Sequence, residues 1–174
     1  GREVLPELLA KLGVTRPILL GHSDGGSIAL LYAAAHPAHV AGLLVLAPHI
    51  LVEDLAVSSI AKAREAYLET DLRERLAKHH QDPDSAFWGW NDIWLHPPFK
   101  QWSIEREIET ITCPLLAVQG VDDEYGTLEQ IRGIARRLPA EAAQARRQRQ
   151  EHEVGGADAV DGGDERDGDP GPHA

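Results

Sequence analysis

The sequence of 174 residues has a single cysteine, no methionine and no long apolar run. Cys113 has no partner for an internal disulfide, which fits a reducing compartment. No stretch approaches the ~20 apolar residues that a membrane-spanning helix needs, and residues 1–13 are amphipathic, unlike a signal peptide. We therefore expect a soluble, cytoplasmic protein.

A basic excess is also lacking, because the net charge is −11. Nucleic acids and anionic membranes both attract basic surfaces, so we expect neither as a partner. No group of His, Cys and Asp shows the spacing of metal ligands. We expect no metal and no other cofactor, and a small molecule as the partner.

Residues 140–174 lack leucine, isoleucine, phenylalanine, tyrosine and tryptophan. Six of the sixteen glycines lie in this stretch, together with nine acidic residues and four arginines. Such a composition cannot bury enough apolar surface to offset the entropy lost on ordering. We therefore predict a disordered tail over residues 140–174.

The remaining chain alternates helical and strand patterns. Residues 16–22, 40–48 and 113–120 are short continuous apolar runs, typical of strands buried on both faces of a parallel sheet. Residues 4–12, 24–36 and 128–139 have apolar positions at helical spacing. This order predicts an α/β fold with crossover helices.

Residues 50–101 interrupt the alternation with a long, mostly helical stretch. Residues 87–102 hold all four tryptophans and both phenylalanines. These aromatic side chains fit either plain packing between this insertion and the sheet or the wall of an apolar pocket. Trp88 and Trp94 are our candidates for a substrate pocket.

A Gly-His-Ser-Asp-Gly motif at residues 21–25 joins a predicted strand to a predicted helix. A sharp turn there exposes Ser23 at the carboxyl end of the sheet, and we expect side chains at the flanking glycines to clash. The helix that follows favours developing negative charge, and the backbone N–H of Asp24 is placed to donate to an oxyanion. A serine in an ordinary tight turn is the alternative.

With this context, residues 4–139 resemble the α/β-hydrolase fold superfamily, in the branch that carries a helical cap. The resemblance implies a partial doubly wound parallel sheet, with the core at residues 1–49 and 102–139 and the cap at 50–101. It implies Ser23 as the nucleophile of an acyl-enzyme mechanism, acting on a small ester, lactone or related carbonyl bond.

The acid of the catalytic triad in this family follows the next strand in a G-x-x-D pattern. Residues 120–123, Gly-Val-Asp-Asp, fit that pattern with Asp123. Asp122 is the alternative one position away, and a solvated acidic turn would explain both residues without any catalytic role.

The triad histidine is not identified. His22 adjoins the nucleophile, so we expect it to point elsewhere and pack, while His36, His39 and His49 fit ordinary surface or loop positions. Two histidines, His152 and His173, follow Asp123. We predict no strand ahead of His152 to fix its position.

In the resemblance, further strands precede residue 4 and a strand precedes the histidine. We therefore expect a fragment with an atypical tail, whose sheet exposes apolar surface at one edge and on one face. Two functions follow from the sequence: a serine hydrolase, or a catalytically inactive, ligand-binding remnant of one. The oligomeric state stays open.

Overall fold

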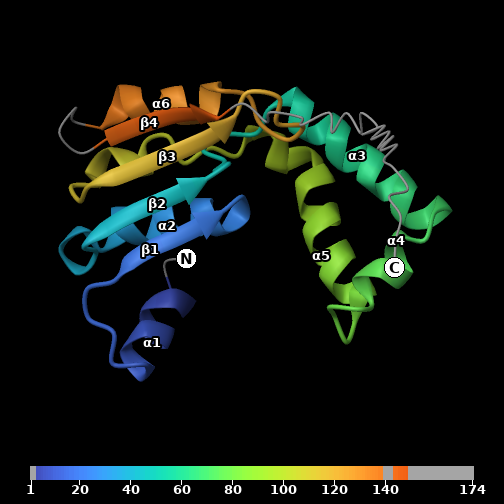
Figure 1. The fold of residues 1–174 in the computed structure, drawn as a ribbon, viewed down its shortest axis with the longest axis horizontal. Helices are drawn as coiled ribbons and strands as arrows, with labels where there is room; N and C mark the ends of the chain where they lie inside the picture. The colour runs from blue at the N-terminus through green and yellow to red at the C-terminus, as the bar shows by residue number, and fades with distance from the viewer. Residues whose placement is uncertain (1–2, 139–142, 149–174) are drawn as a thin grey trace, which may run out of the picture.

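The computed structural model describes residues 3–138 and the backbone of residues 143–148. Four parallel strands form one sheet in the order β1-β2-β3-β4. They are β1 (Ile18–His22), β2 (Gly42–Leu46), β3 (Leu115–Gly120) and β4 (Ala143–Gln148). Because the strands are parallel, their carboxyl ends lie at the same edge of the sheet (Figure 1).

Helices connect the strands in the predicted α/β order. The first is α1 (Val4–Lys11), which precedes β1 and is followed by Gly13 at φ 67°. Then α2 (Asp24–Ala35) and the short η1 (Pro37–His39) lead from β1 to β2, and α6 (Glu129–Arg137) leads from β3 to β4. The predicted α/β class is confirmed.

A mostly helical segment separates β2 from β3 and is called the insertion. It holds α3 (Asp54–Glu69), α4 (Leu72–Leu76), α5 (Pro83–Leu95) and η2 (Pro97–Gln101), and η3 (Glu107–Thr110) follows it. Figure 1 shows α3, α4 and α5 beyond the carboxyl ends of the strands. The chain enters and leaves the insertion side by side, because Leu51 and Ser103 form an antiparallel bridge.

The core lies on one face of the sheet. Leu43, Val45 and Leu115 point to this face and pack with Leu30 of α2 and Ile134 of α6 in a single buried cluster. Alternate strand residues point to the opposite face, where their exposure is greater.

The strands are therefore not buried on both faces among the described residues, and the apolar surface that we expected a fragment to expose on one face is present. In β1, Ile18 and Leu20 are 74% and 68% exposed. Their partners in the neighbouring strands, such as Leu44 and Leu116, are half-buried. The apolar runs are continuous because these strands carry leucines on both faces, although α2 and α6 cover only one.

The carboxylate of Asp84 joins three helices of the insertion through hydrogen bonds. The Asp84 carboxylate of α5 accepts hydrogen bonds from the Tyr67 hydroxyl of α3 at 2.6 Å and from the Arg73 guanidinium of α4 at 2.6 Å. The bonds from Arg73 and Tyr67 lower the pKa of Asp84 to about 2. The ring of Tyr67 also stacks on Phe87.

Strand β4 corrects the prediction of disorder from residue 140, since Ala143–Gln148 pair with β3 in parallel register. The pairing uses backbone groups along the free edge of β3, which any non-proline residue supplies, so an apolar composition is not needed. The rest of the predicted tail lies outside the described residues. Among the helices that the structure describes, none is long and apolar enough to span a bilayer.

Candidate active site

Three loops meet at the carboxyl edge of the sheet. The loop after β1 carries Ser23, the loop after β2 carries His49, and the loop after β3 carries Asp123. Since β2 lies between β1 and β3, the loop that carries His49 follows the middle strand of the three. The structure thus brings the predicted nucleophile and acid to one edge, with a histidine that the sequence did not single out.

Ser23 connects β1 directly to α2 in a strained conformation. Its φ of 53° and ψ of −123° are unusual for a residue with a side chain. Its N–H donates to the Leu46 carbonyl at 2.9 Å, and its carbonyl accepts from Gly26 N–H at 2.9 Å. Backbone bonds on both sides therefore hold the serine in the turn.

The glycines of the motif have unequal roles. A Cβ on Gly21 would lie 2.3 Å from the Gly25 carbonyl oxygen, and one on Gly26 would lie 3.1 Å from the Pro48 Cβ. A Cβ on Gly25 would meet nothing within 4 Å. The clash that we expected at both flanking glycines therefore holds for Gly21 and is wrong for Gly25, which lies in the first turn of α2 with open space beside it.

Asp24 is the first residue of α2, so its backbone N–H belongs to the first turn, where N–H groups have no partner within the helix. Its side chain faces the insertion, because Trp94 Nε1 donates to Asp24 Oδ2 at 3.5 Å. Trp94 is buried and packs with Ala56 and Ile60 of α3. The insertion thus reaches the residue next to Ser23.

The structure distinguishes the two candidate acids. Asp123 is half-buried, and its Oδ1 accepts hydrogen bonds from Tyr125 N–H at 2.8 Å and Gly126 N–H at 3.1 Å. These bonds fix the carboxylate and leave Oδ2 without a hydrogen bond among the described residues. Asp122 is exposed, so the geometry favours Asp123.

The burial of His49 at this edge was not predicted from the sequence. We expected a surface or loop position, and His49 does lie in the loop after β2, but it is only 4% exposed. Ser27 of α2 holds its backbone: Ser27 Oγ donates to His49 O at 2.6 Å, and His49 N–H donates to Ser27 Oγ at 3.2 Å. The imidazole ring meets the Trp94 ring at 4.8 Å between centroids.

Burial sets the protonation of His49. Loss of solvent lowers the pKa of the imidazole below its ordinary value of 6.5, although the Asp24, Asp123 and Glu53 carboxylates act in the opposite direction. His22 also lowers it slightly. The Nδ1 atom is buried with no hydrogen-bond partner among the described residues, so the uncharged form is favoured near neutral pH.

The other predicted residues lie apart from this edge or outside the description. Trp88 has ring contacts with Tyr67 and Phe87, and Arg64 lies over its ring at 5.3 Å. These partners belong to α3 and α5, so the structure places Trp94, and not Trp88, against the Ser23 loop. His22 is exposed and does not pack as we expected.

His152 and His173 lie outside the described residues. Within the part of the chain that is described, no group of His, Cys, Asp and Glu has the geometry of a metal site. The site therefore consists of Ser23, Asp24, His49, Trp94 and Asp123 as far as the described residues define it.

Residues 2–90 match the sequence profile of the alpha/beta hydrolase fold family. A carboxylesterase of the thaumarchaeon Nitrososphaera gargenis is similar in structure, with a TM-score of 0.63 and 19% identity over 84% of this chain and 61% of that one. An enol-lactonase of Burkholderia xenovorans has a TM-score of 0.55 and 20% identity over 83% and 61%.

A meta-cleavage product hydrolase of Pseudomonas fluorescens has a TM-score of 0.61 and 15% identity, over 83% of this chain and 60% of that one. The chain thus spans about three fifths of the length of these structures. No curated protein matches the sequence.

The glycine geometry gives a matched pair of substitutions. Gly21→Ala should lower the free energy of unfolding by about 3 kcal/mol or more, because the new Cβ overlaps a backbone oxygen that cannot rotate away. Gly25→Ala should change it by less than about 1 kcal/mol, since it adds a methyl group to open space in a helix. Urea unfolding followed by tryptophan fluorescence measures both values, and equal losses would contradict this account.

His49 should make the protein less stable in acid. The unfolded chain binds a proton at His49 near pH 6.5, while the folded protein resists it to lower pH, so the unfolded state binds more protons in that interval. The free energy of unfolding should therefore fall between pH 7.5 and 5.5, and fall less in His49→Gln. Urea midpoints at both pH values test this, with His79→Gln at an exposed position as the control. An unchanged pH dependence in His49→Gln would refute it.

Proposed function

Because the chain belongs to the alpha/beta hydrolase fold family, we propose that it is a serine hydrolase with Ser23 as its nucleophile. The observation that carries the proposal is the backbone of Ser23, held at φ 53° between β1 and the first turn of α2. Strain of this kind concentrates at functional sites. It presents the hydroxyl at the end of the sheet and beside the N–H groups of a helix N-terminus.

The proposed reaction passes through an acyl-enzyme. Ser23 Oγ attacks the substrate carbonyl while a histidine takes its proton and passes it to the leaving group. The backbone N–H of Asp24 donates to the oxyanion that forms. Water then attacks the acyl-enzyme while the histidine takes a proton from this water. The histidine returns the proton to Ser23 Oγ, and the carboxylic acid product is released.

We assign the triad acid to Asp123. Its carboxylate is fixed by two backbone N–H groups through Oδ1, which leaves Oδ2 available to an imidazole N–H. An acid held in this way keeps the histidine in one tautomer and stabilises the imidazolium. Asp122 is exposed and has no comparable support.

We assign the base to His152. After Asp123 the chain forms α6 and then β4, the helix and strand that the family resemblance places ahead of the histidine. His152 is the fourth residue after Gln148, where β4 ends. The prediction that no strand precedes His152 is therefore wrong, and this is the support for its assignment.

The proposed substrate is a small ester, lactone or related carbonyl compound with an apolar portion. Apolar side chains of the insertion gather beside Asp24, with Trp94 at their centre and Tyr125 of the Asp123 loop packed against them. Tyr125 also lines a cavity of about 300 Å³ with Phe87 and Trp90. The names of the similar structures, a carboxylesterase and an enol-lactonase, support the same class of bond.

A fluorophosphonate probe distinguishes this proposal from an inactive, ligand-binding remnant. The full chain should be labelled on Ser23, and Ser23→Ala should abolish labelling without changing the free energy of unfolding by more than about 1 kcal/mol. Ser58→Ala, at an exposed position of α3, is the control and should be labelled like the wild type. A folded wild-type protein that stays unlabelled would reject the hydrolase and favour the remnant.

The acid and base assignments are tested by two pairs of variants. Asp123→Asn and His152→Ala should each lower kcat for p-nitrophenyl butyrate by about 10³-fold or more, since each removes a triad member. Asp122→Asn and His173→Ala should leave kcat within about twofold of the wild type. Initial rates at pH 7.5 measure all four, and a larger loss in the second pair would reverse the assignments.

A further inference from the structure

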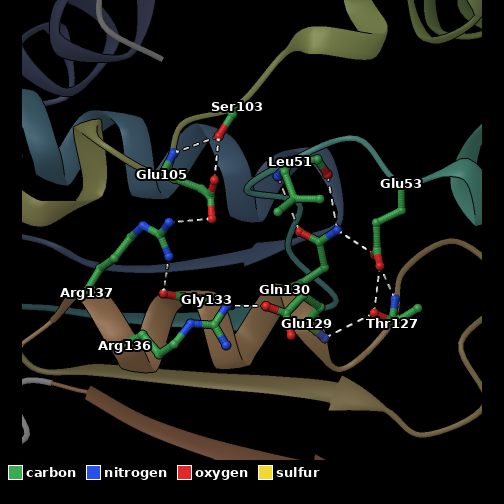
Figure 2. A network of polar contacts seen from close by, with 10 residues as sticks. All are labelled: Leu51, Glu53, Ser103, Glu105, Thr127, Glu129, Gln130, Gly133, Arg136 and Arg137. Atoms are coloured by element: carbon green, nitrogen blue, oxygen red, sulfur yellow. Dashed lines mark hydrogen bonds and ion pairs between the residues drawn. The ribbon is translucent and has the colours of Figure 1, made fainter.

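Gln130 lies in the first turn of α6 and is completely buried. Among the described residues, its side-chain amide bonds to the segment that leads from β2 into the insertion. Gln130 Oε1 accepts from Ile50 N–H at 2.8 Å and Leu51 N–H at 3.4 Å, while Nε2 donates to Leu51 O at 3.1 Å. Figure 2 shows this amide between Leu51 and Glu53. One side chain of α6 thus binds the first residues of the insertion.

The Glu53 carboxylate bonds both to Gln130 and to the loop that carries Asp123. Its Oε2 accepts from Gln130 Nε2 at 2.7 Å and from Thr127 N–H at 2.9 Å. Its Oε1 accepts from the Thr127 hydroxyl at 2.6 Å (Figure 2). Glu53 directly precedes α3, so the start of the insertion is bonded to the end of the Asp123 loop.

Helix α3 also holds the middle of that loop. Ser59 Oγ donates to the Glu124 carbonyl at 2.6 Å. Tyr125 packs on the apolar cluster that contains Ala56 and Ile60. The loop is therefore held from the insertion at residues 124, 125 and 127, immediately after the carboxylate.

The same amide fixes both ends of the insertion. Ile104 N–H donates to the Ile50 carbonyl at 2.8 Å, and Val52 N–H donates to the Trp102 carbonyl at 3.3 Å. Because Gln130 holds Ile50 and Leu51, the returning segment at residues 102–104 is held with them. Any displacement of the insertion would pull on the bonds of Gln130 and Glu53.

We propose that Gln130 is a positioning residue for the reaction at Ser23, which makes this inference dependent on the proposed function. Through Glu53, it fixes the Asp123 loop relative to the insertion, so that both keep one arrangement while the acid supports its histidine. Neither residue touches the reacting atoms. A buried amide that merely satisfied backbone groups would contribute to stability and leave the turnover of folded enzyme unchanged.

The discriminating variant is Gln130→Glu. It keeps the shape of the side chain but replaces the Nε2 donor by a carboxylate oxygen, 2.7 Å from Glu53 Oε2 in the present arrangement. Two carboxylates at this distance repel each other above the pH at which they share a proton. We expect kcat for p-nitrophenyl butyrate at pH 8 to fall by about tenfold or more, because a small displacement of a catalytic group is costly. KM should change by less than about twofold, since the apolar contacts remain.

The pH dependence and a rescue separate positioning from stability. The ratio of variant to wild-type kcat should rise as the pH falls from 8 to 5.5, as the shared proton removes the repulsion. Adding Glu53→Gln to Gln130→Glu removes the repulsion between the two carboxylates, so part of the lost kcat should return and the ratio should depend less on pH. Glu105→Gln is the control: it removes an ion pair between Arg137 of α6 and the chain beyond the insertion, and should leave kcat unchanged.

Amide hydrogen exchange of the Asp123 loop gives a readout that does not need activity. In Gln130→Glu at pH 8, the N–H groups of Tyr125, Gly126 and Thr127 should exchange faster than in the wild type. Where this variant folds poorly, Glu53→Gln alone, at a half-buried position, should show the same effect to a smaller extent. An unchanged loop in folded variants, or kcat that is neither lowered nor rescued, overturns the proposal. A wild-type protein that is not labelled at Ser23 overturns the hydrolase instead, because the exchange rates still show whether Gln130 holds the loop.

Discussion

The contact between Gly21 and the first turn of α2 is the constraint on which the site depends. The helix approaches the strand so closely that no Cβ fits on Gly21. The chain must therefore turn within a single residue, and Ser23 takes the positive φ that this turn requires. The same close approach brings Ser27 onto the backbone of His49 and Gly26 onto Pro48, so the end of β2 is fixed by the turn after β1.

A second set of constraints acts from the other side of the site. The Asp123 loop is held by its own Asp123 carboxylate and by groups of the insertion, through Glu53 and Ser59. The bonds of Glu53 and Ser59 join chain segments more than sixty residues apart. The end of β3 is thus fixed by the insertion, whereas the end of β1 is fixed by α2. Trp94 of the insertion, in contact with both Asp24 and His49, links the insertion to the first set.

Local patterns in the sequence predicted the parts of this structure that depend on local chemistry. The order of strands and helices and the turn at Ser23 follow from apolar spacing and from glycine at a strand–helix junction. Which face of the sheet is covered could not be predicted in this way, because β1 and β2 carry apolar residues on both faces while helices pack on only one. Strand β4 also escaped prediction, since its pairing uses the backbone edge of β3 and not its own side chains.

The polar contacts of the site could not be predicted from local patterns for a different reason. His49 follows a proline after a strand and looks like a loop residue until Ser27, 22 positions earlier, is known to hold it. Gln130 looks like the polar side of an amphipathic helix, yet it bonds to Ile50, 80 positions away. The packing of α2 and α6 on the sheet brings such partners together. This packing cannot be predicted from any short stretch of the sequence.

The arrangement of the strands also explains why the base should come from beyond β4. Ser23 and Asp123 follow strands separated by β2, and two strand spacings amount to about 10 Å. His49 lies in the loop after the strand between them. Its backbone is held by Ser27, its ring lies against Trp94, and its Nδ1 is buried. Its imidazole makes no hydrogen bond to Ser23 or Asp123 among the described residues. The proposed base therefore belongs to the chain that follows β4, the strand that pairs with β3 on the side away from β1.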